Sequence, residues 1–306
     1  MNQPLVSVLI TAYNREEFIA EAIESVLASD YQNFELIVVD DHSHDNTLNI
    51  AKRYENKFEK IKVYSNTQNL GQFPNRNRAA SLASGKYLKY VDSDDVIKPN
   101  TLSIMVEAME SFGDIGIGVV YGIREKLDLS KKTFKVLNSE LAYLWHYTNG
   151  GLLFPGPTGC IYNKENFLNQ NGFPLDLGIN ADVYLNLKIA AISNVALFSN
   201  DLIIWRRHNQ QVDQLQKNYL KMQKERYLID RKILFDGLIP IKKNQLKKIR
   251  LSNKILYMRA AVNNFLVKGE FKKFMCLLSF AGIPVYTLPI ALLPLRYINS
   301  LDGSLK

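Results

Sequence analysis

Three aspartates stand within four residues in the segment Asp92-Ser93-Asp94-Asp95, directly after the apolar run Tyr87–Val91. Carboxylates crowded into one turn suit a hard, oxygen-seeking cation such as Mg²⁺ or Mn²⁺, and diphosphate oxygens would complete its shell. The alternative is a solvated acidic turn in front of a helix that begins near Lys98-Pro99, where carboxylates favour the helix dipole. The surrounding sequence has to decide between a metal site and a helix cap.

Two other apolar runs also end in polar residues. The first closes with Thr11-Ala12-Tyr13-Asn14, and the second closes with Asp40-Asp41-His42-Ser43. The paired carboxylates of Asp40 and Asp41 can accept a hydrogen bond from the imide N–H of a nucleobase. The alternative is an Asx-type turn that leads into a helix capped by Asn46-Thr47. This alternative explains Asp45, but such a turn does not require Asp41.

Cationic side chains follow at two places. Gly71 permits a loop backbone to approach a ligand closely, and Arg76 and Arg78 just beyond it can reach a diphosphate or a base. The alternative is that Pro74 starts a helix and that both arginines lie on the solvated face of this helix. Arg206-Arg207-His208 is either a phosphate clamp or ordinary surface charge. We expect Arg206 in a donor site and His208 among the metal ligands.

Apolar runs and helical patterns alternate through the first hundred residues, and this βαβ rhythm must position the polar clusters. The predicted strands are Leu5–Ala12, Phe34–Val39, Ile61–Ser65 and Tyr87–Val91. The predicted helices between them include Glu16–Ser29 and Asp45–Phe58. Near-continuous apolar strands joined by helices predict a parallel sheet covered on both faces. Because ligands bind beyond the carboxyl ends of such strands, the three polar clusters should converge on one sheet edge.

Four blocks follow one another in a specific order: Ser7–Asn14, Glu35–Thr47, Asn69-Leu70-Gly71 and Tyr90–Asp95. Through these blocks the chain resembles the family 2 glycosyltransferases of the GT-A fold, over roughly residues 5–210. The resemblance implies an α/β fold with a GT-A-type, Rossmann-like, mostly parallel sheet flanked by helices. We expect a catalytic domain over residues 1–208, with a nucleotide-sugar-binding half (1–118) and an acceptor half (119–208), and a basic and apolar helical appendage over residues 209–306.

The same resemblance implies roles for the clusters. Thr11, Tyr13 and Asp41 would lie around a uridine with Asp40 adjacent, and Arg76 would touch the donor. The full set of expected donor-binding residues is Thr11, Tyr13, Asp40, Asp41, Arg76, Asp92, Ser93, Asp94 and Arg206. The expected metal ligands are Asp92, Asp94, Asp95 and His208. His42 departs from the family, which often has glycine after the paired aspartates, so the turn there should be tighter or differently hydrated.

In that family the catalytic base usually belongs to an acidic pair at a helix start, after a Gly-Phe block. Here Gly172-Phe173-Pro174 precedes Asn180-Ala181-Asp182, so Asp182 matches the second acid and alanine replaces the first. The alternative is a first-turn acid behind an Asn180 N-cap, which stabilises the helix by up to about 1 kcal/mol. As the base, Asp182 would remove the acceptor proton in a single displacement, while a cation on Asp92–Asp95 neutralises the departing nucleoside diphosphate.

The resulting prediction is an inverting glycosyltransferase that moves a hexose or N-acetylhexosamine from a UDP-sugar to a saccharide acceptor, with Mn²⁺ or Mg²⁺ as cofactor. A polyprenyl-linked glycan acceptor and a role in cell-surface polysaccharide or glycan biosynthesis are expected. A nucleotidyltransferase is one rival, although the first strand lacks the glycine-rich, basic phosphate loop that favours such chemistry. A non-catalytic sugar-nucleotide sensor or membrane scaffold is the other, and intact Asp182 speaks against it.

The net charge of +8 is concentrated in the tail. Residues 1–209 hold 20 Lys and Arg against 24 Asp and Glu, whereas residues 210–306 hold 18 against 6. The basic segment from Lys242 to Lys254 favours an anionic membrane surface over nucleic acid, because no aromatic stacking motif accompanies the charge. The alternative is a helical hairpin packed on the catalytic domain. The apolar face that follows consists of Ile255, Leu256, Met258, Val262, Phe265 and Leu266.

Residues 274–295 carry no charged side chain and would extend ~33 Å as a helix, near bilayer thickness. Three prolines within this segment argue against a straight span, so we expect a kinked or re-entrant interfacial element. The first residues show no signal-peptide pattern, and Cys160 and Cys276 lack the spacing of disulfide or zinc sites. Together these features predict peripheral or monotopic attachment to the cytoplasmic face of the cell membrane.

Overall fold

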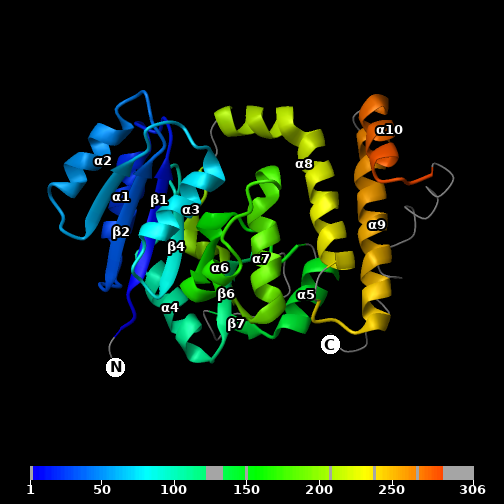
Figure 1. Ribbon diagram of the computed structural model, residues 1–306, viewed down its shortest axis with the longest axis horizontal. Coiled ribbons are helices and arrows are strands. Elements are labelled where there is room, and N and C mark those ends of the chain that lie inside the picture. The colour runs from blue at the N-terminus through cyan, green and yellow to red at the C-terminus, as the bar shows by residue number, and fades with distance from the viewer. Residues whose placement is uncertain are drawn as a thin grey trace. The chain divides into compact units, whose positions relative to one another are not determined.

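The computed structural model (Figure 1) describes residues 3–121, 134–148, 151–206, 209–236, 239–266 and 269–284. An eight-stranded sheet runs in the spatial order β3-β2-β1-β4-β8-β6-β9-β7. In chain order its strands are β1 (Val6–Ala12), β2 (Phe34–Asp40), β3 (Ile61–Ser65), β4 (Tyr87–Asp92), β6 (Ile115–Val120), β7 (Phe134–Leu137), β8 (Cys160–Asn163) and β9 (Asn194–Phe198). The strands β3, β2, β1 and β4 are parallel, whereas β8 lies antiparallel between β4 and β6. The mostly parallel sheet expected from the sequence is confirmed.

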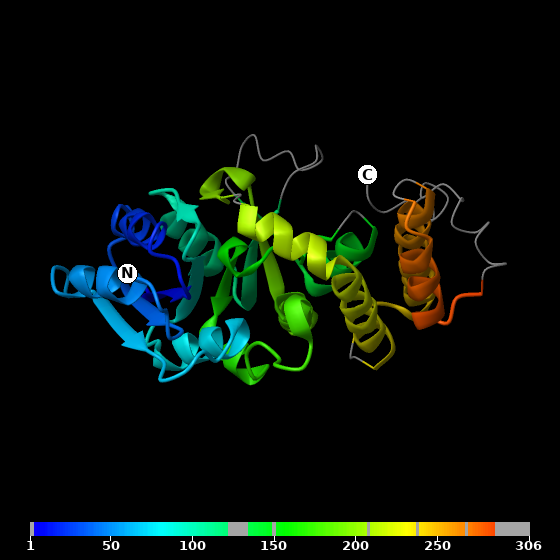
Figure 2. The ribbon, with the colours of Figure 1, turned by 90° about the horizontal axis from the view of Figure 1, so that it is seen from above.

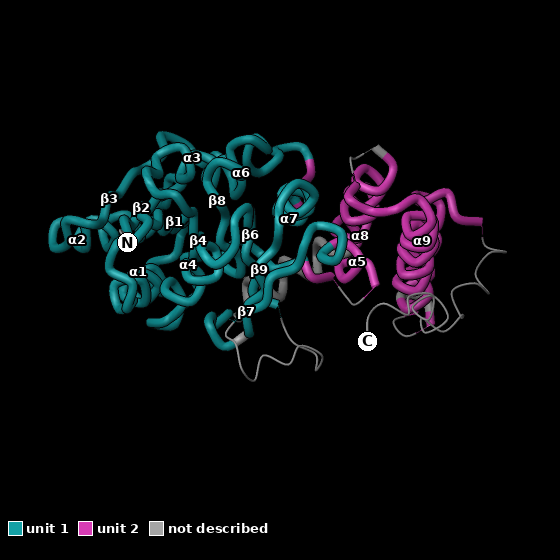
Figure 3. Tube along the Cα trace, turned by 90° about the horizontal axis from the view of Figure 1, so that it is seen from below, with its two compact units in different colours: residues 1–142, 153–176, 181–207 teal, residues 143–152, 177–180, 208–306 magenta. Residues whose placement is uncertain are grey.

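Helices cover both faces of this sheet. The first seven in the chain are α1 (Ile19–Leu27), α2 (Thr47–Glu55), α3 (Gln72–Leu82), α4 (Thr101–Ser111), α5 (Ser139–Thr148), α6 (Lys164–Asn169) and α7 (Ala181–Ile192). The helices α3, α6 and α7 lie on one face, and α1 and α4 lie on the other (Figures 2 and 3). Val8, Leu9 and Ile10 of β1 are therefore all completely buried. Burial on both faces explains why β1 is a continuous apolar run instead of an alternating one.

A two-stranded ribbon ties together segments about a hundred residues apart in the sequence. The strand β5 (Val96–Ile97) pairs antiparallel with β10 (Ile203–Ile204). Just beyond the ribbon, the Lys98 amide and the Thr101 hydroxyl both donate to the Leu202 carbonyl, at 2.9 and 2.7 Å. The ribbon thereby holds the residues after Asp95 next to those before Arg206.

Two compact units make up the chain (Figure 3). The first consists of residues 1–142, 153–176 and 181–207 and contains both sheets, and the second consists of residues 143–152, 177–180 and 208–306. The helices of the second unit are α8 (Asn209–Asp236), α9 (Lys243–Leu266) and α10 (Phe271–Phe280). The predicted functional division at residue 208, with donor and acceptor halves before it, stays a prediction.

The apolar face of α9 serves mainly to build a core within the second unit. Met258 of α9 packs with Leu277 and Leu278 of α10, and Val262 is partly buried against the same cluster. Each such side chain that leaves water stabilises the packing by roughly 1.5–3 kcal/mol. Ile255 is also buried, and of the face predicted to meet a membrane, Leu256 and Leu266 are exposed. Part of that face is therefore covered by α10 within the second unit, and the expected contact with a membrane or with the catalytic domain stays a prediction.

The uncharged segment 274–295 begins inside α10, and its part from residue 285 onward lies outside the described residues. Among the helices that the structure describes, none is both long enough and apolar enough to cross a bilayer.

Candidate active site

The strand register brings the three polar clusters together. Thr11 at the end of β1 lies opposite Asp92 of β4, and Ala12 lies opposite Asp40 of β2. The Asp41 amide donates to the Ala12 carbonyl at 2.8 Å, which continues the ladder past the end of β2. The predicted convergence on one sheet edge therefore follows from the pairing of β2, β1 and β4.

The segment Asp92–Asp95, called the aspartate turn below, is closed by a hydrogen bond from the Asp95 amide to the Asp92 carbonyl at 2.9 Å. The Asp92 side chain is 31% exposed, and its Oδ1 lies 2.6 Å from Nη2 of Arg76. Asp94 is buried and faces Nε of Arg15 at 3.5 Å. Ser93 between them is buried as well. Asp92 and Asp94 each have an arginine partner, and this pairing offsets the repulsion between neighbouring negative charges.

Asp95 has different surroundings from the other two aspartates. It is buried, accepts a hydrogen bond from the Arg206 amide at 3.2 Å, and accepts another from the Thr158 hydroxyl. Burial, followed by the negative charge of Asp92, raises the pKa of Asp95 to about 7. These contacts make Asp95 an anchor of the turn, and its expected role as a metal ligand stays a prediction.

Asp92 and Asp94 carry oxygen donors of the kind that a divalent cation takes. Within the described residues, no group of three or more Asp, Glu, His or Cys side chains is arranged to hold a metal ion. Mg²⁺ needs no such group, because it usually keeps several waters and binds through one or two carboxylates plus substrate phosphates. The two hard carboxylates therefore fit the expected cation. The other predicted ligand, His208, lies outside the described residues.

Arg76 on α3 connects the aspartate turn to the predicted base. It is only 4% exposed, and the Tyr90 hydroxyl donates to its carbonyl at 3.0 Å. Burial alone would lower the pKa of Arg76, but the Asp92 carboxylate outweighs that effect and, with a contribution from Asp182, raises it. The guanidinium thus forms an ion pair with Asp92, and the negative charge of Asp182 also acts on it. Its bond to Asp92 makes it a partner of the aspartate turn, and its predicted contact with the donor stays a prediction.

Asp182 lies in the first turn of α7, next to the loop Pro155–Gly159. Its Oδ1 accepts a hydrogen bond from the adjacent Val183 amide at 2.7 Å, and its position is that of a first-turn acid. Its Oδ2 is close to the loop, since a Cβ atom added to Gly156 would stand 3.9 Å away. Through Thr158, the same loop accepts a hydrogen bond from the Asp92 amide at 2.8 Å. One loop therefore borders both the predicted base and the aspartate turn.

Asp41 holds a loop in place. Its buried carboxylate accepts hydrogen bonds from Asn66 Nδ2 at 2.5 Å and from the amides of Leu70 and Gly71 at 2.8 and 2.9 Å. Gly71 has a φ of +90°, a conformation that favours glycine. The carboxylate expected beside a uridine is thus occupied by the loop that carries the Asn69-Leu70-Gly71 block.

The remaining residues that follow β1 and β2 make fewer hydrogen bonds than Asp41 does. Asp40 accepts from the Ser43 amide at 3.0 Å through Oδ2, and its buried Oδ1 has no hydrogen-bond partner among the described residues. Tyr13 is 41% exposed and lies edge-on to His44. His42 has a φ of +63°, the left-handed region in which glycine is least strained. Glycine would adopt this conformation without strain, which explains why glycine suits the position, and the expected tighter or differently hydrated turn stays a prediction.

The Arg206 side chain is engaged away from Asp95. Its guanidinium pairs with Glu21 and lies over the Phe18 ring, 5.5 Å from the centroid, while its backbone amide bonds Asp95. The contact with the aspartate turn is therefore made by the backbone, and the side chain expected at the donor is held by Glu21. Arg207 lies outside the described residues, as His208 does.

Two residues of the site were missed from the sequence. Arg15 directly follows the first polar cluster, so its charge beside Thr11–Asn14 was a usable signal. Thr158 offered none, because the glycines and prolines of Pro155–Gly159 indicate only a loop.

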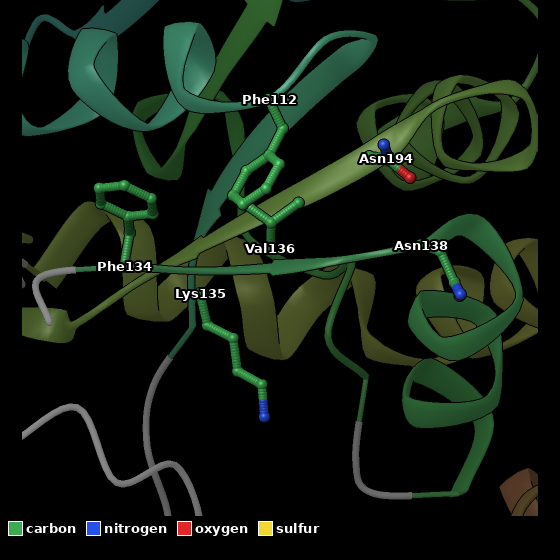
Figure 4. A pocket seen from close by; sticks show the side chains of 6 residues that line it. All are labelled: Phe112, Phe134, Lys135, Val136, Asn138 and Asn194. Atoms are coloured by element: carbon green, nitrogen blue, oxygen red, sulfur yellow. The ribbon is translucent and has the colours of Figure 1, made fainter.

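A separate pocket of about 410 Å³ lies beside the edge strand β7 (Figure 4). It is lined by Phe112, Phe134, Lys135, Val136, Asn138 and Asn194. None of the predicted site residues lines it, so it plays no part in the site described above.

Comparison with known proteins gives one family. The model described as glycosyl transferase family 2 matches residues 7–168, a range that contains the aspartate turn. A glycosyltransferase of Haemophilus influenzae is 39% identical over 109 residues, which are 36% of this chain and 34% of the relative. The match with this relative thus spans about a third of its length.

Solved structures agree in fold. S. aureus TarS 1–349 in complex with UDP-GlcNAc is 22% identical, with a TM-score of 0.69 over 97% of this chain and 88% of that one. The mannosyltransferase PcManGT from Pyrobaculum calidifontis, in complex with GDP-Man and Mn²⁺, is 17% identical, with a TM-score of 0.66 over 99% and 81%. At these identities the likeness concerns the fold, and it confirms the expected GT-A type.

Proposed function

The chain belongs to glycosyl transferase family 2, and on this basis we propose that it transfers a sugar from a UDP-sugar to a saccharide acceptor. The observation that carries the proposal is the loop Pro155–Gly159, which lies beside Asp182 and, through Thr158, accepts a hydrogen bond from the Asp92 amide at 2.8 Å. In the proposed reaction Asp92 and Asp94 hold a cation for the leaving diphosphate, and Asp182 is the base for an acceptor hydroxyl. These are the two requirements of sugar transfer by direct displacement.

In the proposed reaction, Asp182 takes the proton from the acceptor hydroxyl while that oxygen attacks the anomeric carbon. The bond from this carbon to the diphosphate breaks on the opposite face, and the nucleoside diphosphate leaves with its electron pair. No covalent enzyme intermediate forms, so the anomeric configuration inverts. Thr11, Tyr13 and Asp40 surround the nucleoside, and Asp41 acts on it through the loop that it holds.

A divalent cation, Mn²⁺ or Mg²⁺, held by Asp92 and Asp94 would neutralise the charge that develops on the departing diphosphate. Arg76 and Arg15 keep these two carboxylates in place through the ion pairs described above. The Mn²⁺ in the PcManGT complex supports this choice of cofactor.

A donor screen tests the proposal. The purified protein is incubated with Mn²⁺, a saccharide acceptor and each of several donors: the UDP forms of glucose, galactose and their N-acetyl derivatives, and GDP-mannose. The UDP-GlcNAc complex of TarS supports a uridine donor, whereas the GDP-Man complex of PcManGT defines the competing base. We expect UDP release coupled to sugar transfer. Transfer from GDP-mannose alone would overturn the uridine assignment, donor binding without turnover would indicate a sensor, and cleavage between the two phosphates would indicate nucleotidyl chemistry.

We also propose that the protein acts at the cytoplasmic face of the membrane, on a polyprenyl-linked glycan, in polysaccharide biosynthesis. The support is a stripe on α9, where Lys243, Lys247 and Lys254 are exposed and Leu251 lies exposed between them. Residues spaced three or four apart share one side of a helix. Such a basic stripe with an apolar side chain suits an anionic lipid surface.

A further inference from the structure

The strand β4 carries a lysine that the proposed chemistry does not use. Lys89 is completely buried, opposite Ile161 of β8 and Val8 of β1. Its ammonium donates to the carbonyl oxygens of Tyr90 at 2.6 Å and of Thr158 at 2.5 Å. Burying a charge is costly unless it is hydrogen-bonded, so a lysine at this position requires an explanation in terms of what it holds.

What Lys89 holds is the backbone of Thr158, and Thr158 in turn holds the aspartate turn. The Thr158 hydroxyl accepts from the Asp92 amide at 2.8 Å and donates to the Asp95 carboxylate. Both ends of the turn therefore meet at one buried side chain. The contacts run from the Lys89 ammonium through Thr158 to Asp92 and Asp95.

The charge of Lys89 has a second effect on the aspartate turn. Three carboxylates in four residues repel one another, and a buried cation on the protein side of the turn opposes that repulsion. Burial lowers the pKa of Lys89 to about 8, and the charges of Cys160, Asp92 and Asp95 oppose that shift. A neutral side chain could donate to the same carbonyl but would not provide this attraction.

We propose that Lys89 and Thr158 are positioning residues that fix the backbone of the aspartate turn before the donor arrives, so that Asp92 and Asp94 are already placed for a nucleoside diphosphate and its cation. The identity of this ligand rests on the function proposed above, whereas the placement of the turn does not. Both residues are buried, and they act through the turn without touching the substrate. A purely structural pair would lower the melting temperature without changing donor affinity.

Three variants separate these possibilities. Thr158→Val removes the hydroxyl with little change in volume, and Thr158→Ser keeps it. Thr101→Val is the matched control, because it removes another completely buried threonine hydroxyl, which bonds the Leu202 carbonyl at 2.7 Å. The first measurement is amide hydrogen exchange at Asp92 in metal-free protein. The second is UDP affinity with Mn²⁺ by calorimetry, together with the KM for donor and for acceptor.

In Thr158→Val we expect faster exchange at Asp92, UDP binding weakened by about tenfold, and a raised KM for the donor but not for the acceptor. Thr158→Ser should restore all three, and Thr101→Val should change only the melting temperature. Lys89→Met should weaken UDP binding as Thr158→Val does, with little further loss in the double variant because the two residues act in one chain of contacts.

The proposal is overturned if Thr158→Val keeps the protection of Asp92 and the affinity for UDP, or if Thr158→Ser is impaired as much as Thr158→Val. Wild-type protein that binds no nucleoside diphosphate would refute the proposed function instead. In that case the exchange rate at Asp92 still decides whether Thr158 positions the turn.

Discussion

At the scale of single residues, the site is a set of buried and half-buried charges that pair with one another. Arg76 pairs with Asp92, Arg15 pairs with Asp94, and Asp95 accepts from a backbone amide. Removing one member of such a pair leaves the other uncompensated in a medium that stabilises charge poorly. Substitutions in the site should therefore affect stability as well as activity, and the two effects have to be measured separately.

Asp182 is expected to be essential for transfer but not for donor binding. Asp182→Asn keeps the size of the side chain and removes the base, so the transfer rate should fall by about 10²–10⁴-fold. UDP affinity by calorimetry should stay close to that of the wild type. Asp176→Asn, at an exposed acid six positions earlier, is the control. Near wild-type transfer by Asp182→Asn would show that another group is the base.

Asp41 is expected to matter for stability. Asp41→Asn retains one oxygen but turns an NH₂ group toward the donors that the carboxylate now serves, namely Asn66 and the amides of Leu70 and Gly71. Hydrogen bonds to a charged group contribute about 1.5–3 kcal/mol, so the free energy of unfolding should fall by about 2 kcal/mol. Urea denaturation measures the change. An unchanged midpoint would mean that the loop does not depend on Asp41.

The location of these residues could be predicted from the sequence, but their partners could not. Asp40, Asp41 and the aspartate turn all follow buried strands, and parallel strands place their carboxyl ends at one edge. The partners come from loops and from distant segments: Thr158 reaches the turn from a loop without periodicity, and Arg206 reaches it through the β5–β10 ribbon. Pattern and spacing carry no information on such contacts.

At the scale of elements, burial decided how well the sequence could be interpreted. The strands β1 to β4 were predicted because they are apolar throughout, as strands covered on both faces must be. The start of α1 was predicted too early, at Glu16 instead of Ile19, because the chain first makes a turn in which the Phe18 amide donates to the Arg15 carbonyl at 3.0 Å. The packing of α9 on α10 was left open, since an apolar helix face does not specify its partner.

The loop before α3 should tolerate a side chain poorly at Gly71. Open space surrounds this glycine, but its φ of +90° strains any other residue, so Gly71→Ala should lower the free energy of unfolding by about 1–2 kcal/mol. Gly113→Ala is the matched control, because Gly113 also has open space around it but no left-handed backbone. Equal urea midpoints for the two variants would contradict the conformational explanation.

The contact between α5 and α8 should make stability depend on pH. His146 Nε2 lies 3.2 Å from Nη2 of Arg226, and burial, followed by the Arg226 charge, lowers the pKa of His146 well below 6.5. The unfolded chain binds a proton there near pH 6.5 that the folded chain does not bind, so stability falls as the pH drops below about 6.5.

His146→Gln keeps an acceptor for Arg226 and removes the titration. Denaturation at about pH 7.5 and about pH 5.5 should therefore show a smaller loss of stability in His146→Gln than in the wild type. Identical losses in the two proteins would show that His146 does not contribute to the pH dependence.

At the scale of the whole molecule, the first unit carries the family match, whereas the second unit is marked mainly by its charge. The family match of residues 7–168 lies within the range from which the fold was predicted. The second unit carries much of the chain's excess positive charge but no motif that specifies chemistry. Its helices could be predicted from periodicity, whereas its location in the cell rests on surface charge alone.

Membrane attachment predicts a specific loss of vesicle binding. Each lysine near an anionic surface contributes about 1 kcal/mol, so replacing Lys243, Lys247 and Lys254 together with glutamate should abolish most binding to phosphatidylserine-containing vesicles. Sedimentation of the protein with vesicles at low and high salt measures it. The same change at Lys57, Lys60 and Lys62, exposed lysines of the first unit, is the control. Equal effects of the two triple variants would exclude the α9 stripe as the attachment site.

The most direct test of the proposed transfer is the anomeric configuration of its product. An α-linked UDP-sugar that is active in the donor screen is incubated with the protein, Mn²⁺ and an acceptor, and NMR coupling constants give the configuration of the new linkage. Displacement assisted by Asp182 predicts a β-linked product and one UDP released per sugar transferred. An α-linked product would contradict a single displacement with Asp182 as the base.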